Sequence, residues 1–230
     1  MPIKNRLAEL MPEIADWRRE IHMNPELLFD LPKTTALVAA KLEEIGVDEI
    51  HTGIGRSGLV ALIRGKSDGS GRCIGLRADM DALPMDEQTG LPHASRTPGR
   101  MHACGHDGHT AMLLGAAKYL AETRNFDGTV ALIFQPAEEG GGGGDLMVRD
   151  GMMERFGIDE VYGMHNEPGL PVGEFGVSPG PIMAAADEFE VRIVGKGGHA
   201  ARPHMCTDPT PAACNVVMAL QTVAARNVDP

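Results

Sequence analysis

The fold class of this chain follows from residues 128–136, which read GTVALIFQP. Val130 to Phe134 are apolar without interruption, and the run is bounded by Gly128 and Pro136, which disfavour regular structure. A short apolar run of this kind is typical of a strand buried on both faces, as in a sheet covered by helices. The run therefore predicts a strand inside an α/β protein.

Helical patterns lie on both sides of this strand in the sequence. Apolar residues recur at helical spacing from Leu7 to Ile21, from about Lys33 to Ile45, and from about His109 to Glu122. Gly46 follows the second pattern and suits a left-handed helix end. Val161 to Met164 resembles a further buried strand. Strands that alternate with helices predict an α/β sandwich.

Two shorter apolar runs predict a β-hairpin. Leu59 to Ile63 and Cys73 to Leu76 flank residues 65–71, which contain many turn-forming residues. We therefore expect these two runs to pair with each other in the sheet.

The sequence pattern changes after Pro181. Apolar residues alternate with charged ones over residues 188–193, as in a strand with one wet face, and a helical pattern follows from about Pro211 to Arg226. We therefore expect two domains, residues 1–184 and residues 185–230. One strand and one helix cannot close a core alone. Either the chain is a portion of a longer protein, or a partner covers this surface.

Composition limits the classes of partner. The net charge is −11 and hydrophobic residues make up 43%, so we expect a folded acidic protein without a basic patch for nucleic acid or an anionic membrane. No apolar run approaches ~18 residues, and charges near the N-terminus leave no signal-peptide core. The cysteines lack C-x-x-C spacing and are expected to be reduced thiols: Cys73, Cys104, Cys206 and Cys214. We expect a cytoplasmic protein.

Polar side chains follow three of the predicted strands at the point where each strand ends. The residues concerned are Asp79 and Asp81, Glu138 and Glu139, and His165. Ligands of open α/β sheets bind outside the carboxyl ends of the strands. Any one of these could be an ordinary loop residue, but together they indicate a metal or acid–base site.

The segment of residues 101–109 adds three histidines and a cysteine. Thiolate and imidazole are preferred zinc donors, and an i, i+2 spacing lets Cys104 and His106 face one centre. The alternative is a helix start with incidental histidines. The remaining polar residues of the segment are expected to orient the ligands without binding the metal: His102, Asp107 and His109.

The adjacent acids Glu138 and Glu139 suggest a division of labour. Neighbouring residues in a bent loop do not readily face one metal together. We therefore expect one to bind the metal while the other takes a proton from the attacking water. The alternative is a solvated acidic pair.

Two further segments have open interpretations. The five glycines at residues 140–144 do not form a phosphate loop, because Asp145 follows them in place of Lys-Ser or Lys-Thr. They leave room for a ligand or form a flexible loop. His199, in the predicted second domain, is either a substrate-polarising group or a turn histidine without a role.

Taken together, these motifs resemble the M20 metallopeptidase family, and most closely its aminoacylase-like branch of hippurate hydrolases and indole-acetyl-amino acid hydrolases. Five segments carry the resemblance in family order: residues 77–84 (RADMDALP), 101–109 (MHACGHDGH), 135–140 (QPAEEG), 163–165 (GMH) and 197–204 (GGHAARPH). The resemblance implies a zinc-peptidase-like three-layer sandwich with a mixed sheet, followed by the beginning of a smaller α+β lid or dimerisation domain.

The resemblance also implies a role for each site residue. Glu138 would be the general base and acid. Asp81 stands where the wider family keeps an acid that supports the metal site, although Asp79 replaces the histidine that usually precedes it. His199 matches a lid histidine that steadies an oxyanion, in some members from the partner subunit. Two divalent ions of zinc, manganese, cobalt or nickel would be bound by Cys104, His106, Glu139 and His165.

The activity implied by the resemblance is hydrolysis of the amide bond of an N-acyl amino acid, such as hippurate, by a metal-activated water. Family members are longer than this chain, and their returning segment supplies a further metal-binding histidine. We therefore expect this chain alone to be an incomplete amino-terminal portion that is weakly active or inactive. A homodimer through the lid domain is also implied. Two alternatives remain: a thiol hydrolase with Cys104 as nucleophile, and a non-catalytic metal-binding or interaction fragment.

Overall fold

The computed structural model describes residues 3–183 and 188–227. The chain forms two compact units, Met1–Pro171 and Val172–Pro230. The first unit contains all the strands of the described residues, and the second contains one long helix. The domain boundary predicted between residues 184 and 185 lies outside the described residues.

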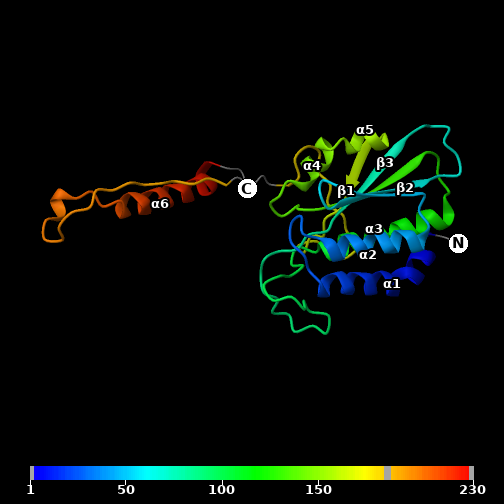
Figure 1. The fold of residues 1–230 in the computed structure, drawn as a ribbon, viewed down its shortest axis with the longest axis horizontal. Helices are drawn as coiled ribbons and strands as arrows, with labels where there is room; N and C mark the ends of the chain where they lie inside the picture. The colour runs from blue at the N-terminus through cyan, green and yellow to red at the C-terminus, as the bar shows by residue number, and fades with distance from the viewer. Residues whose placement is uncertain (1–2, 184–187, 228–230) are drawn as a thin grey trace. The chain divides into compact units, whose positions relative to one another are not determined.

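The first unit is built around one five-stranded sheet with the order β1-β2-β4-β3-β5 (Figure 1). Its strands are β1 (Glu49–Ile54), β2 (Gly58–Arg64), β3 (Cys73–Asp79), β4 (Thr129–Gln135) and β5 (Glu160–Gly163). β2 pairs antiparallel with β1 and with β4, whereas β3 pairs parallel with β4 and with β5. The predicted mixed sheet is confirmed.

Strand β4 lies in the middle of the sheet, and its central residues are buried, as the apolar run predicts. Leu132 and Phe134 belong to one apolar core, and Ala131 and Ile133 belong to a second core on the opposite face. A fully buried side chain of Leu, Ile or Phe contributes about 1.5–3 kcal/mol. The strand therefore stabilises two packing interfaces at once.

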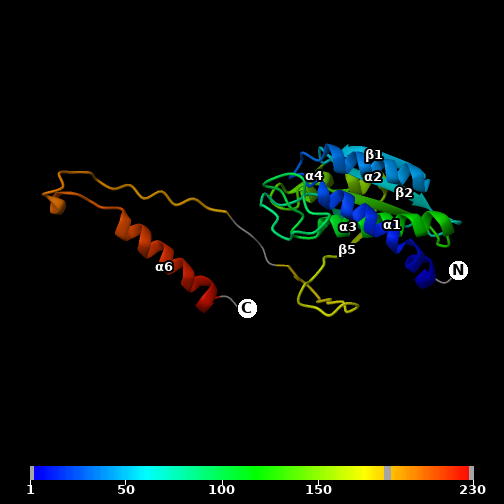
Figure 2. The ribbon, with the colours of Figure 1, turned by 90° about the horizontal axis from the view of Figure 1, so that it is seen from below.

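Helices cover both faces of the sheet (Figures 1 and 2). The core that contains Leu132 is closed by α1 (Ile3–Met23), α2 (Pro32–Ile45) and α3 (His106–Thr123). The core that contains Ile133 is closed by α4 (Gly143–Arg149) and α5 (Met152–Phe156). The layers are thus helices, sheet and helices, and the predicted α/β sandwich is confirmed.

The ends of two helices bear on the sequence predictions. α2 ends before Gly46, whose φ of 80° confirms the predicted left-handed end. α3 begins at His106, earlier than the predicted His109. The difference matters because it places His106 in the first turn of a helix instead of in the preceding loop.

The predicted hairpin of residues 59–63 and 73–76 is wrong. β4 lies between β2 and β3, so these two strands do not pair with each other. The hairpin partner of β2 is β1, which joins it through residues 55–57. β1 is only partly buried and reads EIHTGI, so no apolar run marks it in the sequence.

The second unit contains a 3₁₀ turn (Pro203–Met205) and α6 (Thr210–Asn227), which confirms the predicted helix. The strand predicted at residues 188–193 is not found there, and the β-bridge of the described part of this unit joins Lys196 and Thr207. An alternating pattern forms a strand only where a neighbour supplies hydrogen bonds. Within the described residues, no helix is both long and apolar enough to cross a membrane.

Candidate metal centre

The polar residues that follow β3, β4 and β5 gather at one edge of the sheet. These strands are parallel neighbours, so their carboxyl ends lie side by side. Asp79 is the last residue of β3, Glu138 and Glu139 follow β4, and His165 follows β5. The topology therefore brings together side chains that lie far apart in the sequence.

The start of α3 brings sulfur and imidazole donors to the same edge. Gly105 precedes the helix with a φ of 100°, a conformation that favours glycine, and lets the chain turn between Cys104 and His106. Cys104 Sγ lies 3.3 Å from His165 Nε2. Donor atoms within 4.8 Å of one another form three groups: Cys104, His106 and His165; Asp79, His106 and His109; and His106, Glu138 and Glu139.

His106 and His165 each present Nε2 to this centre. His106 Nδ1 donates to the backbone carbonyl of Asp81 over 2.8 Å, and His165 Nδ1 donates to that of Asn166 over 2.7 Å. A proton on Nδ1 leaves the lone pair of Nε2 free for a metal ion, and such a second hydrogen bond is usual for metal-binding histidines.

Buried acceptor atoms without partners fit a divalent cation at this place. His106 Nε2 and Glu139 Oε1 have no hydrogen-bond partner among the described residues, and they lie 3.8 Å apart. Glu138 Oε2 lies 3.8 Å from the same nitrogen. A buried polar atom left unsatisfied costs about 1–3 kcal/mol. A cation held by imidazole, thiolate and carboxylate would satisfy these atoms, so the donor set fits the metal that the sequence predicts.

Asp81 lies beneath the acid pair and is almost completely buried. Its Oδ1 accepts the backbone N–H of Glu138 over 3.0 Å, and its Oδ2 accepts that of Glu139 over 3.1 Å. Ala137, just before this pair, has a φ of 49°, which is strained for a residue with a side chain. The Asp81 carboxylate thus holds the bend that sends Glu138 and Glu139 to different positions.

A second supporting chain runs from Asp79 through His109 to Asn166. His109 Nδ1 donates to Asp79 Oδ1 over 2.7 Å, and His109 Nε2 lies 2.6 Å from Asn166 Oδ1 and 3.1 Å from the backbone nitrogen of Asn166. Both ring nitrogens of His109 therefore have protein partners. Burial would raise the pKa of Asp79, but the hydrogen bond from His109 and the charge of Arg77 outweigh burial and lower that pKa to about 2. Asn166 carries no sequence signal that would have marked it.

The surroundings of Cys104 disfavour a free thiolate. Burial, together with the negative charges of Glu139, Glu138 and Asp79, raises the pKa of the Cys104 thiol to about 12. In the absence of a cation this thiol therefore stays protonated at neutral pH. Binding of a divalent ion by the sulfur would displace that proton.

The two adjacent glutamates differ in exposure. The side chain of Glu138 is 41% exposed, whereas that of Glu139 is 18% exposed. Glu138 can therefore be reached from solvent, and Glu139 lies deeper, against His106. The division of labour expected from their adjacency stays a prediction.

His199 lies in the second unit. It is exposed, and its Nδ1 accepts the backbone N–H of Ala201 over 3.2 Å. Its predicted contact with substrate stays a prediction.

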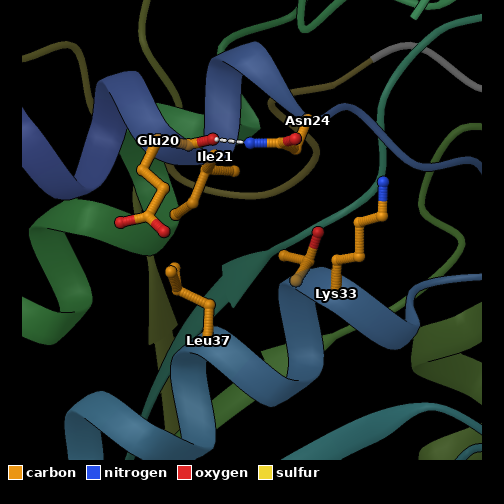
Figure 3. A pocket seen from close by; sticks show the side chains of 6 residues that line it. Glu20, Ile21, Asn24, Lys33 and Leu37 are labelled. Atoms are coloured by element: carbon orange, nitrogen blue, oxygen red, sulfur yellow. Dashed lines mark hydrogen bonds between the residues drawn. The ribbon is translucent and has the colours of Figure 1, made fainter. Parts of the chain in front are cut away.

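A surface hollow of about 220 Å³ between α1 and α2 is separate from this cluster (Figure 3). It is lined by Glu20, Ile21, Asn24, Lys33, Thr34 and Leu37. None of these residues belongs to the groups of donor atoms described above. The hollow therefore has no part in the candidate metal centre.

The fold and the site define a three-layer α/β protein with a candidate metal centre of sulfur, imidazole and carboxylate donors at the carboxyl edge of a mixed sheet. The sequence model of peptidase family M20/M25/M40 matches residues 75–228. The chain belongs to this family, as its motifs predict.

Individual relatives agree with this assignment. Hippurate hydrolase of Campylobacter jejuni is 48% identical over 228 residues, which cover 96% of this chain and 58% of that protein. N-acetyl-L-cysteine deacetylase of Bacillus subtilis is 47% identical over 225 residues, which cover 97% of this chain and 53% of that protein.

Solved structures give the same result. The crystal structure of the YXEP protein of Bacillus subtilis, described as a dinuclear metal binding peptidase from the M20 family, matches with a TM-score of 0.71 at 43% identity. The match covers 76% of this chain and 48% of that one. The chain thus spans little more than half the length of the curated relatives it matches.

Proposed function

We propose that the protein to which this chain belongs is a metal-dependent amidohydrolase that cleaves N-acyl amino acids. The observation that carries the proposal is the convergence of donor atoms from Cys104, His106 and His165 beside Glu138 and Glu139. The relatives named hippurate hydrolase and N-acetyl-L-cysteine deacetylase support this substrate class.

We propose that the donor set holds two divalent ions, and zinc, manganese, cobalt and nickel are all compatible with it. The structural relative described as dinuclear supports a pair of ions. Such ions, when bound, lower the pKa of a coordinated water to about 7 and polarise a carbonyl oxygen. The proposed ligands are Cys104, His106, Glu139 and His165.

Glu138 is the proposed general base and acid. It is the more exposed member of the acid pair, and its carboxylate lies 3.8 Å from His106 Nε2, at the edge of the donor cluster. From this position it can take a proton from the attacking water and return it to the leaving amide nitrogen. Asp81 is almost completely buried and has a positioning role, because it acts on Glu138 through the backbone.

The substitution Glu138→Gln tests the assignment in the whole protein. It removes the proton acceptor and keeps the shape of the side chain, so bound metal should be unchanged while hydrolysis of hippurate falls at least ~10²-fold. Glu139→Gln is the matched comparison and should lower metal content as well. Full activity of the Glu138→Gln protein would end the general-base assignment.

A thiol hydrolase is the rival enzyme, because Cys104 Sγ and His165 Nε2 lie 3.3 Å apart, as in a nucleophile–base pair. The raised pKa of Cys104 argues against it, since the carboxylates around the sulfur oppose a thiolate. Chelation separates the two mechanisms. A metal enzyme loses activity in a strong chelator and regains it with added zinc or manganese, whereas a thiol enzyme stays active.

Three further proposals concern the whole protein. The first is that His199 polarises the substrate carbonyl. The second is that the second unit mediates a homodimer. The third is that the protein works in the cytoplasm. All four cysteines are free, which supports a reducing compartment. Light scattering in solution tests the dimer. Loss of activity in His199→Ala, with unchanged metal content, tests the role of His199.

A further inference from the structure

A second cluster of buried charges adjoins the metal centre where α1, the first turn of α3 and the loop of residues 84–100 meet. Its centre is His22, which is 4% exposed. His22 Nδ1 lies 2.8 Å from Asp107 Oδ2, and His22 Nε2 lies 3.3 Å from Glu87 Oε1. Asp107 directly follows the proposed ligand His106, so this cluster reaches the metal centre through the backbone.

Both carboxylates around His22 act as acceptors. Asp107 Oδ2 also accepts Arg18 Nε over 2.9 Å, and Glu87 Oε2 accepts the backbone N–H of Ser95 over 2.6 Å. An ionised carboxylate can only accept hydrogen bonds. His22 must therefore donate from both ring nitrogens, and a histidine that does so is an imidazolium.

Among the described residues, two further histidines face His22. The ring of His93 lies 5.7 Å away, edge to face, and the ring of His102 lies 6.2 Å away. Neither ring nitrogen of His102 has a hydrogen-bond partner among the described residues, so His102 does not compete for the carboxylates. The hydrogen bond to Asp107 is the largest cause that raises the pKa of His22.

The start of α3 lacks the usual means of fixing a helix end. Gly105 stands at the N-cap position and makes no side-chain hydrogen bond to the helix. Asp107, in the first turn, is instead bonded to His22 and Arg18 of α1. These bonds fix the turn that carries His106.

We propose that His22 is a positioning residue whose imidazolium ties α1 and the loop of residues 84–100 to Asp107, and so preorganises Cys104 and His106 for metal binding. This inference rests on the metal centre of the proposed function. Side chains that hydrogen-bond directly to metal ligands typically change metal affinity 10–100-fold when they are lost, and His22 acts on His106 through its neighbour Asp107.

The test compares the zinc affinities of the His22→Gln and His51→Gln variants, each prepared free of metal. His51 is the matched control, because it also pairs with a glutamate, Glu49, over 2.8 Å, but lies on β1 and faces Phe156. Zinc affinity is measured by competition with a chromophoric chelator. We expect a 10–100-fold loss for His22→Gln and none for His51→Gln. Equal affinities of the two variants would overturn the proposal.

A second measurement keeps the proposal distinct from that of the metal centre. Nitrogen NMR of the ring of His22 in the metal-free chain should show both nitrogens protonated at pH 7, and a neutral ring would overturn the inference. Glu87→Gln leaves the bond between His22 and Asp107 in place, so its loss of zinc affinity should be smaller than that of His22→Gln. If His22→Gln fails to fold, the zinc affinity of Glu87→Gln is compared with that of His51→Gln instead. If Cys104→Ser leaves zinc affinity unchanged, the proposed metal centre is wrong. The NMR result still decides whether the ring of His22 is an imidazolium.

Discussion

Asp81 controls the acid pair through the backbone. Each of its carboxylate oxygens accepts one N–H, from Glu138 and Glu139, and Asp81 itself is almost completely buried. Hydrogen bonds to charged groups contribute about 1.5–3 kcal/mol to stability. The residue therefore affects both the stability of the bend and the direction of the side chain of Glu138, the proposed general base.

Replacement of Asp81 by Asn should lower the free energy of unfolding by about 1.5–3 kcal/mol, because the new amide group faces an N–H where an acceptor is needed. Denaturant unfolding measures the loss. Asp145→Asn is the control, since Asp145 forms an exposed i,i+4 pair with Arg149 and should change stability by no more than ~0.5 kcal/mol. Equal effects of the two substitutions would contradict the buried role of Asp81.

The stability contributed by His22 should depend on pH. Its pKa in the folded protein is raised, mainly by the bond to Asp107. The contribution is therefore fully present below the ordinary histidine pKa of ~6.5 and is lost as the pH rises through the raised value. Unfolding of the native chain and of His22→Gln, measured from pH 5 to pH 9, should show a gap that is widest at low pH. A gap independent of pH would contradict an imidazolium at His22.

At the scale of elements, local sequence patterns predicted strands and helices better than they predicted neighbours. The run of β4 and the spacing in α1 and α2 depend on burial of the segment itself, so they are visible in the sequence. The pairing of β2 depends on which strand lies beside it, and β4, about 70 residues later, takes the place that the predicted hairpin gave to β3. α4 and α5 were not predicted, because they are too short to show helical periodicity.

In the glycine run that precedes and begins α4, the tightest packing is at Gly143. A Cβ added at Gly143 would lie 1.7 Å from the carbonyl oxygen of Pro136, which is backbone and cannot rotate away. Gly143→Ala should therefore destabilise the chain by about 1–3 kcal/mol or more. Gly144→Ala is the control, because the nearest atom there belongs to the side chain of Gln135. Similar melting temperatures for the two variants would contradict this packing.

At the scale of the molecule, the sequence predicted the edge of the sheet where the candidate metal centre lies. The rule that ligands bind at the carboxyl ends of parallel strands was enough to place Asp79, Glu138 and His165 together. The supporting contacts could not be predicted. Asn166 and His22 bond to residues far away in the sequence, and no local pattern shows which distant segments lie side by side. The strand expected in the second unit lacks a pairing partner in the described residues. Whether a partner is present depends on other segments, so the alternating pattern alone could not predict it.

Metal should stabilise the chain as a whole. An ion that binds only the folded state adds about 2.7 kcal/mol when its free concentration is 100 times its Kd. Zinc should therefore raise the melting temperature of the native chain, and a chelator should lower it in metal-loaded samples. Cys104→Ser and His106→Asn should reduce this shift, whereas Cys214→Ser, at an exposed position of the second unit, should keep it.

The most direct measurement is a crystal structure of the metal-loaded protein with anomalous scattering recorded at the absorption edge of the bound metal. We predict anomalous peaks within bonding distance, about 2.0–2.3 Å, of Cys104 Sγ, of the Nε2 atoms of His106 and His165, and of a Glu139 oxygen. Glu138 should lie beside the peaks without binding them. Peaks located elsewhere in the chain, or no peak beside His106 at saturating metal, would contradict the proposed centre.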